Sequence, residues 1–271
     1  MRDQEPRNWS DLTPELTCSI LVRLGAVEIL ENAQKVCRSW RRISKEPSLW
    51  RKIDIRNLGD RKISGGSEMC RHAVNRSEGC LVEINIGNFG SDSLLIYIAD
   101  RSPNLRSLGL VMNCLITTNG LVKAVSKLPL LEELELEVSN TFSTLDLKAI
   151  GHSCPKLKTL KLNCTGSILI PWVVHDDDDA LAIAESMPQL HHLELIGNTL
   201  TNTGLNAILD KCPHLEHLDL RMCSNIYLWG DLEKRCLERV KDLRRPNDST
   251  ADYPYFAAFS DTGSDDDSDN I

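Results

Sequence analysis

Short segments with apolar residues at alternate positions recur along the chain. Aligned on a shared proline, five copies read PNLRSLGLVMN (103–113), PLLEELELEVS (129–139), PKLKTLKLNCT (155–165), PQLHHLELIGN (188–198) and PHLEHLDLRMC (213–223). The alternation in each copy predicts a strand whose leucines point inward and whose intervening residues point outward. A weaker copy, CLVEINIGNF, lies at 80–89, and WRKIDIRNL at 50–58 is expected to form a strand that leads into the series.

Helical segments are expected between these strands. TNGLVKAVSKLP (118–129) and TNTGLNAILDKCP (201–213) begin with Thr or Asn and then carry Leu, Ala and Val at helical spacing. A strand-plus-helix unit that returns every 25 to 33 residues is typical of leucine-rich repeats, in which one repeat cannot bury its apolar face alone. We therefore predict an α/β fold. It is a short leucine-rich-repeat solenoid over 80–240, with parallel strands on the concave face, helices on the convex face and a C-terminal cap helix within 227–246.

The first fifty residues follow a different, helical pattern. Thr13 is a candidate helix N-cap, Pro14 suits the first helical position, and Gly25 ends the segment. The stretch 27–44 predicts a second helix with Val36, Trp40 and Ile43 on one face, and PSLW at 47–50 closes the module. Three helices of this length form a small core, so a partner or the first repeats should cover their surplus apolar surface.

These residues resemble an F-box. The resemblance rests on Trp9, the LTPEL start at 12–16, VCRSWR at 36–41 and Leu49-Trp50 at the close. The repeats, with Cys-Pro at 154–155 and 212–213, are similar to the cysteine-containing leucine-rich repeats that follow F-boxes in plant F-box/LRR-repeat proteins. One departure is Leu-Thr-Pro at 12–14, where the family starts Leu-Pro. On this basis we expect an F-box over 7–55, a connecting first-repeat region over 56–79, and the repeats over 80–240.

The resemblance implies a function. An F-box docks on a Skp-type adaptor, and through it on a cullin, while the repeats hold a target protein. The chain would be the substrate-recognition subunit of an SCF-type (Skp–cullin–F-box) E3 ubiquitin ligase, whose catalysis is positional and belongs to other subunits. The residues that the resemblance places against the adaptor are Leu12, Pro14, Glu15, Leu16, Ile20, Leu21, Leu24, Val36, Cys37 and Trp40. For several of these, Trp40 above all, internal packing is the alternative.

Candidate substrate contacts follow from the outward positions of the strands. Glu133, Glu135 and Glu137 alternate with leucines, so three like charges are expected side by side, either as a landing patch for a basic segment or as a solvated face. Further candidates are Lys161, His192, His217 and Arg221 on the strand copies and Trp172 in an insertion at 166–179. The adjacent histidines also suggest zinc, although a solvated polar face is the simpler interpretation.

Two other function classes compete with the ligase hypothesis. One is an F-box/LRR scaffold that binds partners without ligase activity. The other is a small-molecule sensor, which a strand face of roughly 25 Å is too short to form by closing around a ligand. The chain has no GxxxxGK[ST], GxGxxG, HExxH or GxSxG motif, so we expect no enzyme activity and no cofactor or metal.

The charge distribution and the cysteines limit the partners and the cellular compartment that we expect. Of 39 acidic residues, seven follow Pro246, which leaves 32 against 31 basic residues in the body. A near-neutral body argues against nucleic acid as a partner, because phosphate binding needs a basic surface. No apolar segment is long enough to span a membrane and no secretory signal is evident, so we expect the nucleus or the cytoplasm. The ten cysteines are then reduced, and those in the repeats should act as small buried apolar groups.

The C-terminal end is predicted to be a disordered acidic tail over 245–271. It nevertheless holds four aromatic residues, Tyr253, Tyr255, Phe256 and Phe259. Such a cluster suggests either a short docking motif or packing back onto the solenoid.

Overall fold

In a computed structural model of the full chain, the described residues are 9, 12–56, 58, 63–111, 115–137, 145–164 and 176–253. Within them one sheet of eight parallel strands runs in chain order from β1 to β8. The strands are β1 Lys52–Ile55, β2 Glu83–Ile86, β3 Ser107–Val111, β4 Glu133–Glu137, β5 Thr159–Asn163, β6 His192–Glu194, β7 His217–Asp219 and β8 Asp242–Arg244. The five proline-led copies and the two weaker segments are thus confirmed as strands.

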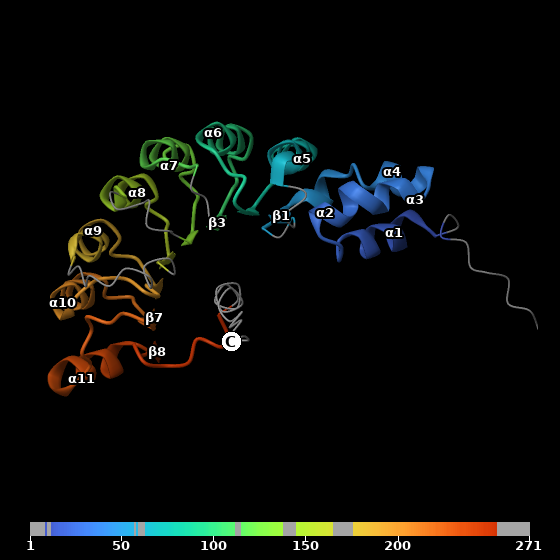
Figure 1. The fold of residues 1–271 in the computed structure, drawn as a ribbon. Helices are drawn as coiled ribbons and strands as arrows, with labels where there is room; N and C mark the ends of the chain where they lie inside the picture. Colours follow the sequence, from blue (N-terminus) through green and yellow to red (C-terminus); the bar gives the residue numbers. More distant parts are fainter. Residues whose placement is uncertain are drawn as a thin grey trace, which may run out of the picture.

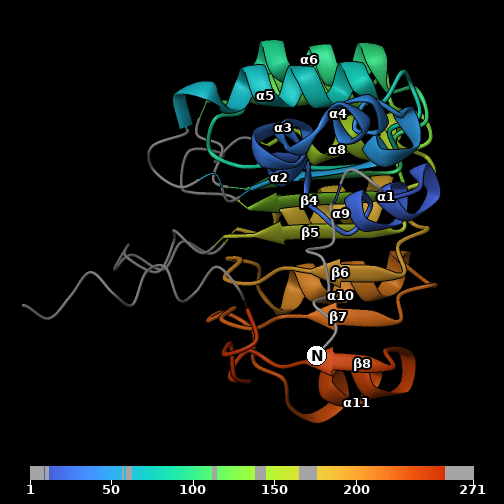
Figure 2. The same cartoon turned by 90° about the vertical axis from the view of Figure 1, so that its right-hand side faces the viewer.

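Helices cover one face of this sheet. They are α5 Ile63–Arg76, α6 Asp92–Arg101, α7 Thr118–Val125, α8 Leu147–Ser153, α9 Asp178–Ser186, α10 Asn202–Lys211 and α11 Gly230–Arg239. Figure 1 shows the chain as an arc with the helices on its outer side and the strands lining its inner side. Figure 2, turned by 90°, shows the strands stacked side by side. The predicted solenoid with a concave strand face and a convex helix face is confirmed.

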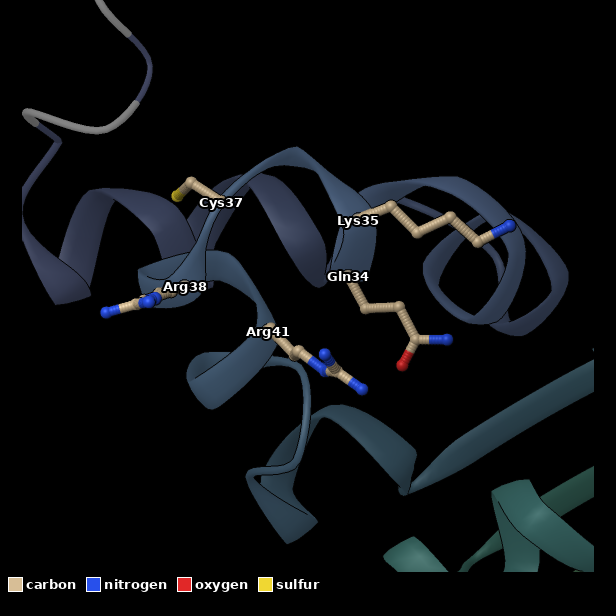
Figure 3. Close-up of a pocket in the computed structure, with 5 residues that line it drawn as sticks. All are labelled: Gln34, Lys35, Cys37, Arg38 and Arg41. Carbon is tan, nitrogen blue, oxygen red and sulfur yellow. The ribbon is translucent and has the colours of Figure 1, made fainter.

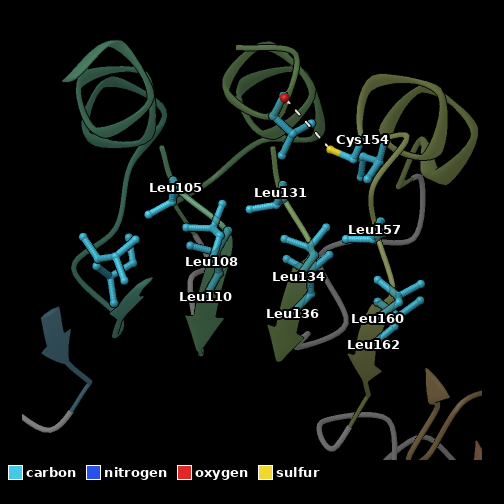
Figure 4. Packing of buried hydrophobic residues seen from close by; sticks show 14 of the residues in the cluster. Leu105, Leu108, Leu110, Leu131, Leu134, Leu136, Cys154, Leu157, Leu160 and Leu162 are labelled. Atoms are coloured by element: carbon cyan, nitrogen blue, oxygen red, sulfur yellow. Dashed lines mark hydrogen bonds between the residues drawn. The ribbon is translucent and has the colours of Figure 1, made fainter. Parts of the chain in front are cut away.

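The core is a ladder of leucines that stays in register from strand to strand. Leu108 pairs with Leu134, and Leu134 pairs with Leu160, each at the same height in the sheet. All three side chains are buried, as are the leucines that precede and follow them in each repeat (Figure 4). Burial of one leucine contributes about 1.5–3 kcal/mol. Each repeat gains this only because its neighbours cover its two sides.

The repeat cysteines belong to this core. Cys154 and Cys212 are buried, and their thiols point to the carbonyls of Val125 and Met187 in the preceding repeat, at 4.0 and 3.6 Å (Figure 4 shows the first). Burial raises the pKa of Cys154 to about 12 and that of Cys212 to about 11. These thiols are therefore protonated at neutral pH, and the interpretation as small buried apolar groups is confirmed for both.

Aspartates link successive helices. Asp177 accepts hydrogen bonds from the backbone N–H groups of Thr201 and Gly204 at the start of α10, at 2.7 and 3.1 Å. A Cβ on Gly204 would lie 2.4 Å from the Asp177 carboxylate, so glycine is needed for this approach. Asp92 makes the same type of contact with Thr117 ahead of α7. Each carboxylate caps the next helix and so fixes the stacking of two repeats.

The N-terminal module (residues 12–50) is a set of short helices packed on the first strand. Its elements are α1 Pro14–Leu21, α2 Ala26–Glu28, the π-helix Ile29–Ala33, α3 Gln34–Val36, α4 Arg38–Ile43 and the 3-10 helix Pro47–Trp50. The single second helix predicted over 27–44 is wrong. Cys37 is extended, with φ −157° and ψ 175°, and its sulfur accepts from the Trp40 N–H at 3.5 Å as the cap of a new helix. The break sends Val36 outward while Trp40 packs inward.

The cap also differs from the prediction. The helix in 227–246 ends at Arg239, and Asp242–Arg244 adds the eighth strand, in which Leu243 continues the ladder opposite Leu218. Residues 246–253, which the prediction assigns to the tail, lie within the described chain, and the side chain of Tyr253 is buried. For Tyr253 the packing alternative therefore holds, while Tyr255, Phe256, Phe259 and the rest of the predicted tail lie outside the described residues.

Removal of a ladder side chain should cost several times more than removal of an exposed one. We expect Leu134→Ala to lower the free energy of unfolding by about 2–5 kcal/mol, because a cavity opens between two repeats. Leu115→Ala, at an exposed leucine in the turn before α7, should stay within about 0.5 kcal/mol. Urea denaturation measures both variants. Equal effects would contradict the stacked ladder as the source of stability.

Candidate functional site

The first surface of interest is the exposed apolar start of the N-terminal module. Thr13 caps α1, its hydroxyl accepting from the Leu16 N–H at 3.3 Å, and thereby presents the first turn to solvent. Leu16 is 53% exposed and Val36 is 51% exposed. Pro14 and Glu15 are exposed as well. Exposed large apolar side chains on a small module indicate a contact surface.

The other predicted adaptor residues lie deeper. Four of them are half-buried against the module's core, namely Leu12, Ile20, Leu24 and Cys37. Leu21 and Trp40 are buried, so for these two the internal-packing alternative holds. The Trp40 indole N–H donates to the Trp9 carbonyl at 3.3 Å, and the two rings meet edge to face with centroids 6.0 Å apart. Trp40 therefore packs inside the module, whereas the side chain of Trp9 is exposed.

A basic pocket adjoins this surface. Figure 3 shows its lining residues, Gln34, Lys35, Cys37, Arg38 and Arg41, around the turn that Cys37 makes between α3 and α4. The sequence does not predict this pocket, because the pocket depends on the break at Cys37. Three cations around one hollow favour an acidic partner group.

The module is joined to the solenoid through buried Trp50. Its indole N–H donates to the Ser44 carbonyl at 2.9 Å, and the guanidinium of Arg76 on α5 lies 5.2 Å from its ring centroid. Arg76 also donates to the Gln34 side chain at 2.9 Å. Burial, together with Arg41, lowers the pKa of Arg76. Because α5 thus contacts both Trp50 and α3, the two parts of the chain have a fixed relative orientation.

The second surface is the concave face, which strand register arranges in rows. One row holds Glu83, Ser107, Glu133, Thr159, His192, His217 and Asp242, and the next holds Asp54, Asn85, Gly109, Glu135, Lys161, Glu194, Asp219 and Arg244. Five predicted substrate contacts lie in these two rows, namely Glu133, Glu135, Lys161, His192 and His217. Two more, Glu137 and Arg221, lie two residues further along the chain, after Glu135 and Asp219. Trp172 lies outside the described residues.

Glu135 occupies the middle of the concave face between two cations. Arg56 reaches it from the end of β1 at 3.9 Å, and Lys161 is opposite it on β5. Two glycines nearby allow close packing, since a Cβ on Gly87 would lie 2.5 Å from the Arg56 carbonyl oxygen and a Cβ on Gly109 would lie 2.1 Å from the Asn85 side-chain oxygen. Burial nevertheless raises the pKa of Glu135, and Lys161 and Arg56 only partly offset it.

Glu137 does not project freely, contrary to the expectation of three exposed carboxylates. Its side chain is buried, at 4% exposure, and accepts a hydrogen bond from the hydroxyl of Tyr253. Asn163, its partner on β5, hydrogen-bonds the same hydroxyl and is also buried. The patch therefore reduces to Glu133 and Glu135. Alternation alone could not reveal a cover that comes from 116 residues further along the chain.

Arg221, directly after β7, is also covered. Its side chain is 6% exposed and makes a bidentate pair with Asp219, at 2.7 and 3.0 Å. It donates as well to the Ser249 carbonyl at 2.9 Å and to the Asp252 carboxylate. The hydrogen bond with Asp219 raises the pKa of Arg221, although burial opposes it. Arg221 thus holds the segment after β8 rather than facing open solvent.

The histidines form two stacks between β6 and β7. The rings of His192 and His217 lie 5.2 Å apart, and those of His191 and His214 lie 5.7 Å apart. His192 contacts Glu194 at 2.8 Å, and Lys161 contacts the same carboxylate at 3.4 Å. Burial would raise the pKa of Glu194, but these two partners lower it. No three of the described His, Cys, Asp or Glu side chains are grouped to hold a metal ion. The stacks therefore supply no zinc ligand set within that part of the chain.

Comparison with known proteins shows to which family the chain belongs. An F-box-like model matches residues 9–56. Putative F-box/LRR-repeat protein 21 of Arabidopsis thaliana is 59% identical over 270 residues, covering 93% of this chain and 86% of its own length. Putative F-box/LRR-repeat protein 22 of the same plant is 55% identical over 265 residues, covering 97% and 84%. The chain belongs to the plant F-box/LRR-repeat family.

A solved structure gives a similar fold. The crystal structure of the yeast Rad7–Elc1 complex aligns with a TM-score of 0.51 over 88% of this chain and 70% of the matched chain, at 19% identity. That identity supports the fold alone. In the F-box/LRR chain no helix among the described residues is long and apolar enough to cross a membrane. The F-box corresponds to the N-terminal module, and the concave face belongs to its leucine-rich repeats.

The buried carboxylate of Glu135 should make stability depend on pH. A pKa raised in the folded state means that ionisation opposes folding above the unfolded value of about 4.3. We therefore expect Glu135→Gln to be more stable than the wild type at neutral pH, with a gain that disappears below about pH 4. Urea denaturation at several pH values measures this difference.

Glu216→Gln provides the matched control. Glu216 is half-exposed, and Lys241 lowers its pKa, so this variant should lose slight stability at neutral pH rather than gain it. If Glu135→Gln were the less stable protein at neutral pH, attraction to Arg56 and Lys161 would outweigh burial.

Proposed function

We propose that this F-box/LRR chain is the substrate-recognition subunit of an SCF-type E3 ubiquitin ligase. Its F-box would dock a Skp-type adaptor, and through it a cullin, while the concave face of the repeats holds a target protein. The observation that carries the proposal is the pairing of an exposed apolar F-box surface with a concave polar face on one rigid chain. Such a subunit acts by holding substrate lysines near the ubiquitin-charged enzyme, and the chemistry belongs to other subunits. The site of action would be the nucleus or the cytoplasm.

The adaptor would cover the apolar surface around Leu16 and Val36. These side chains have no cover within the described chain, and their burial against a partner would contribute about 1.5–3 kcal/mol each. The adjacent pocket with Lys35, Arg38 and Arg41 adds three cations at the edge of the contact. Rim charges of this kind mainly raise the association rate and fix the orientation. An adaptor with acidic groups beside an apolar groove fits this arrangement.

The substrate would bind along the open rows of the concave face. Glu133 and Glu135 remain partly accessible there, and Ser107 donates to Glu133 at 3.2 Å. A basic segment of a target protein would relieve the charge of the two carboxylates. Lys161, His192 and His217 on neighbouring strands would contact the same segment or its flanks. The alternative is a scaffold that binds the adaptor and a partner without promoting ubiquitin transfer.

Loss of the apolar surface should abolish adaptor binding. Leu16→Asp with Val36→Asp places two charges in a contact that must become dry, so we expect binding to weaken at least about 100-fold. Both side chains are exposed, which leaves folding intact. Leu237→Asp, at an exposed leucine on α11, is the control. Co-purification with a Skp-type adaptor measures all three proteins. Undiminished recovery of the adaptor by the double variant would refute the docking proposal.

Neutralising the carboxylate pair should weaken substrate capture. Glu133→Gln with Glu135→Gln keeps the shape of the surface, so the charge is the main change. We expect capture to fall several-fold at low salt and to lose most of its salt dependence. Glu185→Gln with Glu238→Gln, at exposed glutamates on α9 and α11, is the charge-matched control. Pull-down of bound proteins at two salt concentrations tests this. If substrate capture and its salt dependence were both unchanged, Glu133 and Glu135 would be solvated side chains without a role in capture.

A further inference from the structure

The segment after β8 crosses to the concave face instead of ending at the cap. Figure 1 shows it turning from β8 into the hollow of the arc. α11 and β8 precede this segment as the cap of the last repeat, and Cys236 on α11 and Val240 between the two elements are buried. The segment reaches Glu137 on β4, three strands from β7, which is about 14 Å at about 4.8 Å per strand. It therefore covers a polar face rather than an apolar core.

Two adjacent residues hold the end of this segment. Tyr253 is buried and donates its hydroxyl proton to Glu137, and Asn163 hydrogen-bonds the same hydroxyl. Asp252 pairs with Arg221 and lies 3.3 Å from Arg244. The receiving side chains, Glu137 and Arg221, are both more than nine-tenths buried. Such groups are costly to bury for packing alone, but they recognise a complementary ligand with high selectivity.

The rest of the segment is loosely attached. The Pro246 carbonyl accepts from the Met222 N–H at 2.8 Å near the start of the segment, and the Arg221 guanidinium holds the Ser249 carbonyl. Asn247, Ser249 and Ala251 are exposed. Release of Asp252 and Tyr253 would free the end of the segment without disturbing the ladder of leucines. An internal segment bound through two side chains and two backbone carbonyls resembles a tethered ligand, whose local concentration is in the millimolar range.

We propose that the concave face between β4 and β7 is a recognition site for an acidic residue followed by tyrosine in a substrate protein, and that Asp252–Tyr253 occupies it until such a substrate displaces them. Arg221 reads the acidic side chain, and Glu137 with Asn163 reads the phenol hydroxyl. The proposal rests on the proposed function only in treating the concave face as the substrate surface. The site uses Glu137 and Arg221, whereas the proposed binding of a basic segment uses Glu133 and Glu135, which lie in other rows.

Binding of the segment in trans is the first test. A chain ending at Arg245 retains β8 and all eight strands, and a capped peptide of residues 246–253 supplies the missing contacts. We expect this chain to bind the peptide, and the full chain to bind it at least tenfold more weakly because its own segment competes.

In the peptide, Tyr253→Phe and Asp252→Asn should each weaken binding at least tenfold. Thr250→Ala in the peptide, which keeps the backbone carbonyl that accepts from Tyr253, should change little. Fluorescence anisotropy measures each affinity.

A second variant covers the case in which the shortened chain does not fold. The full chain with Asp252→Ala and Tyr253→Ala keeps the backbone of the segment but opens the site, and it should bind the peptide at least tenfold more tightly than the wild type. A folded shortened chain or double variant that does not bind the peptide would overturn the proposal. Unfolding of the double variant would equally overturn it, since the segment would then be a structural cap. Co-purification of a Skp-type adaptor with the same proteins tests the proposed function separately.

Discussion

The stacking of each repeat on its neighbours is the constraint on which the other features of this chain depend. Every strand pairs with the strands of the adjacent repeats, and the register keeps Leu108, Leu134 and Leu160 at one height. The residues between the leucines must then point to the concave side in straight rows. The burial of leucines therefore determines which polar side chains become neighbours on the proposed binding face. The aspartate caps at Asp92 and Asp177 tie the helices to the same spacing.

The junction between the F-box and the solenoid fixes the exposed apolar surface of the F-box relative to the concave face of the repeats. Trp50 is fully buried, and Arg76 from the first solenoid helix lies over its ring while bonding Gln34 on the F-box side. A flexible link would let a captured protein sample many orientations. Under the proposed function, a fixed link would hold the captured protein in one orientation relative to the adaptor, as positional catalysis requires. The junction thereby connects the burial of one tryptophan with the proposed function.

The sequence predicts those parts of the structure that depend on local periodicity. Leucines at period two identify the strands, and Thr13 with Pro14 identifies the start of α1. The break at Cys37 cannot be predicted in this way, because the apolar spacing continues through it. The short strand β8 was missed because Lys241–Arg245 has only one apolar residue to continue the ladder.

The site was predicted less completely than the fold, because its features depend on contacts between distant residues. Alternation gives the outward direction of Glu137 and Arg221 correctly, but nothing near them indicates that Asp252 and Tyr253 cover them. In the same way, the contact of Arg56 with Glu135 crosses from the end of β1 to β4 over two intervening strands, which no local pattern indicates. The resemblance to the family predicts the candidate adaptor residues, and their burial separates exposed ones from ones that pack inside the module.

The most direct test of the account is ubiquitin transfer in a reconstituted reaction. The full chain would be combined with a Skp-type adaptor, a cullin–RING complex, ubiquitin-activating and ubiquitin-conjugating enzymes, and a protein captured on the concave face. The account predicts that ubiquitin is attached to lysines of the captured protein, and that Leu16→Asp with Val36→Asp abolishes the transfer while leaving capture unchanged. A chain that binds adaptor and captured protein together without any transfer of ubiquitin would contradict the account and favour the scaffold.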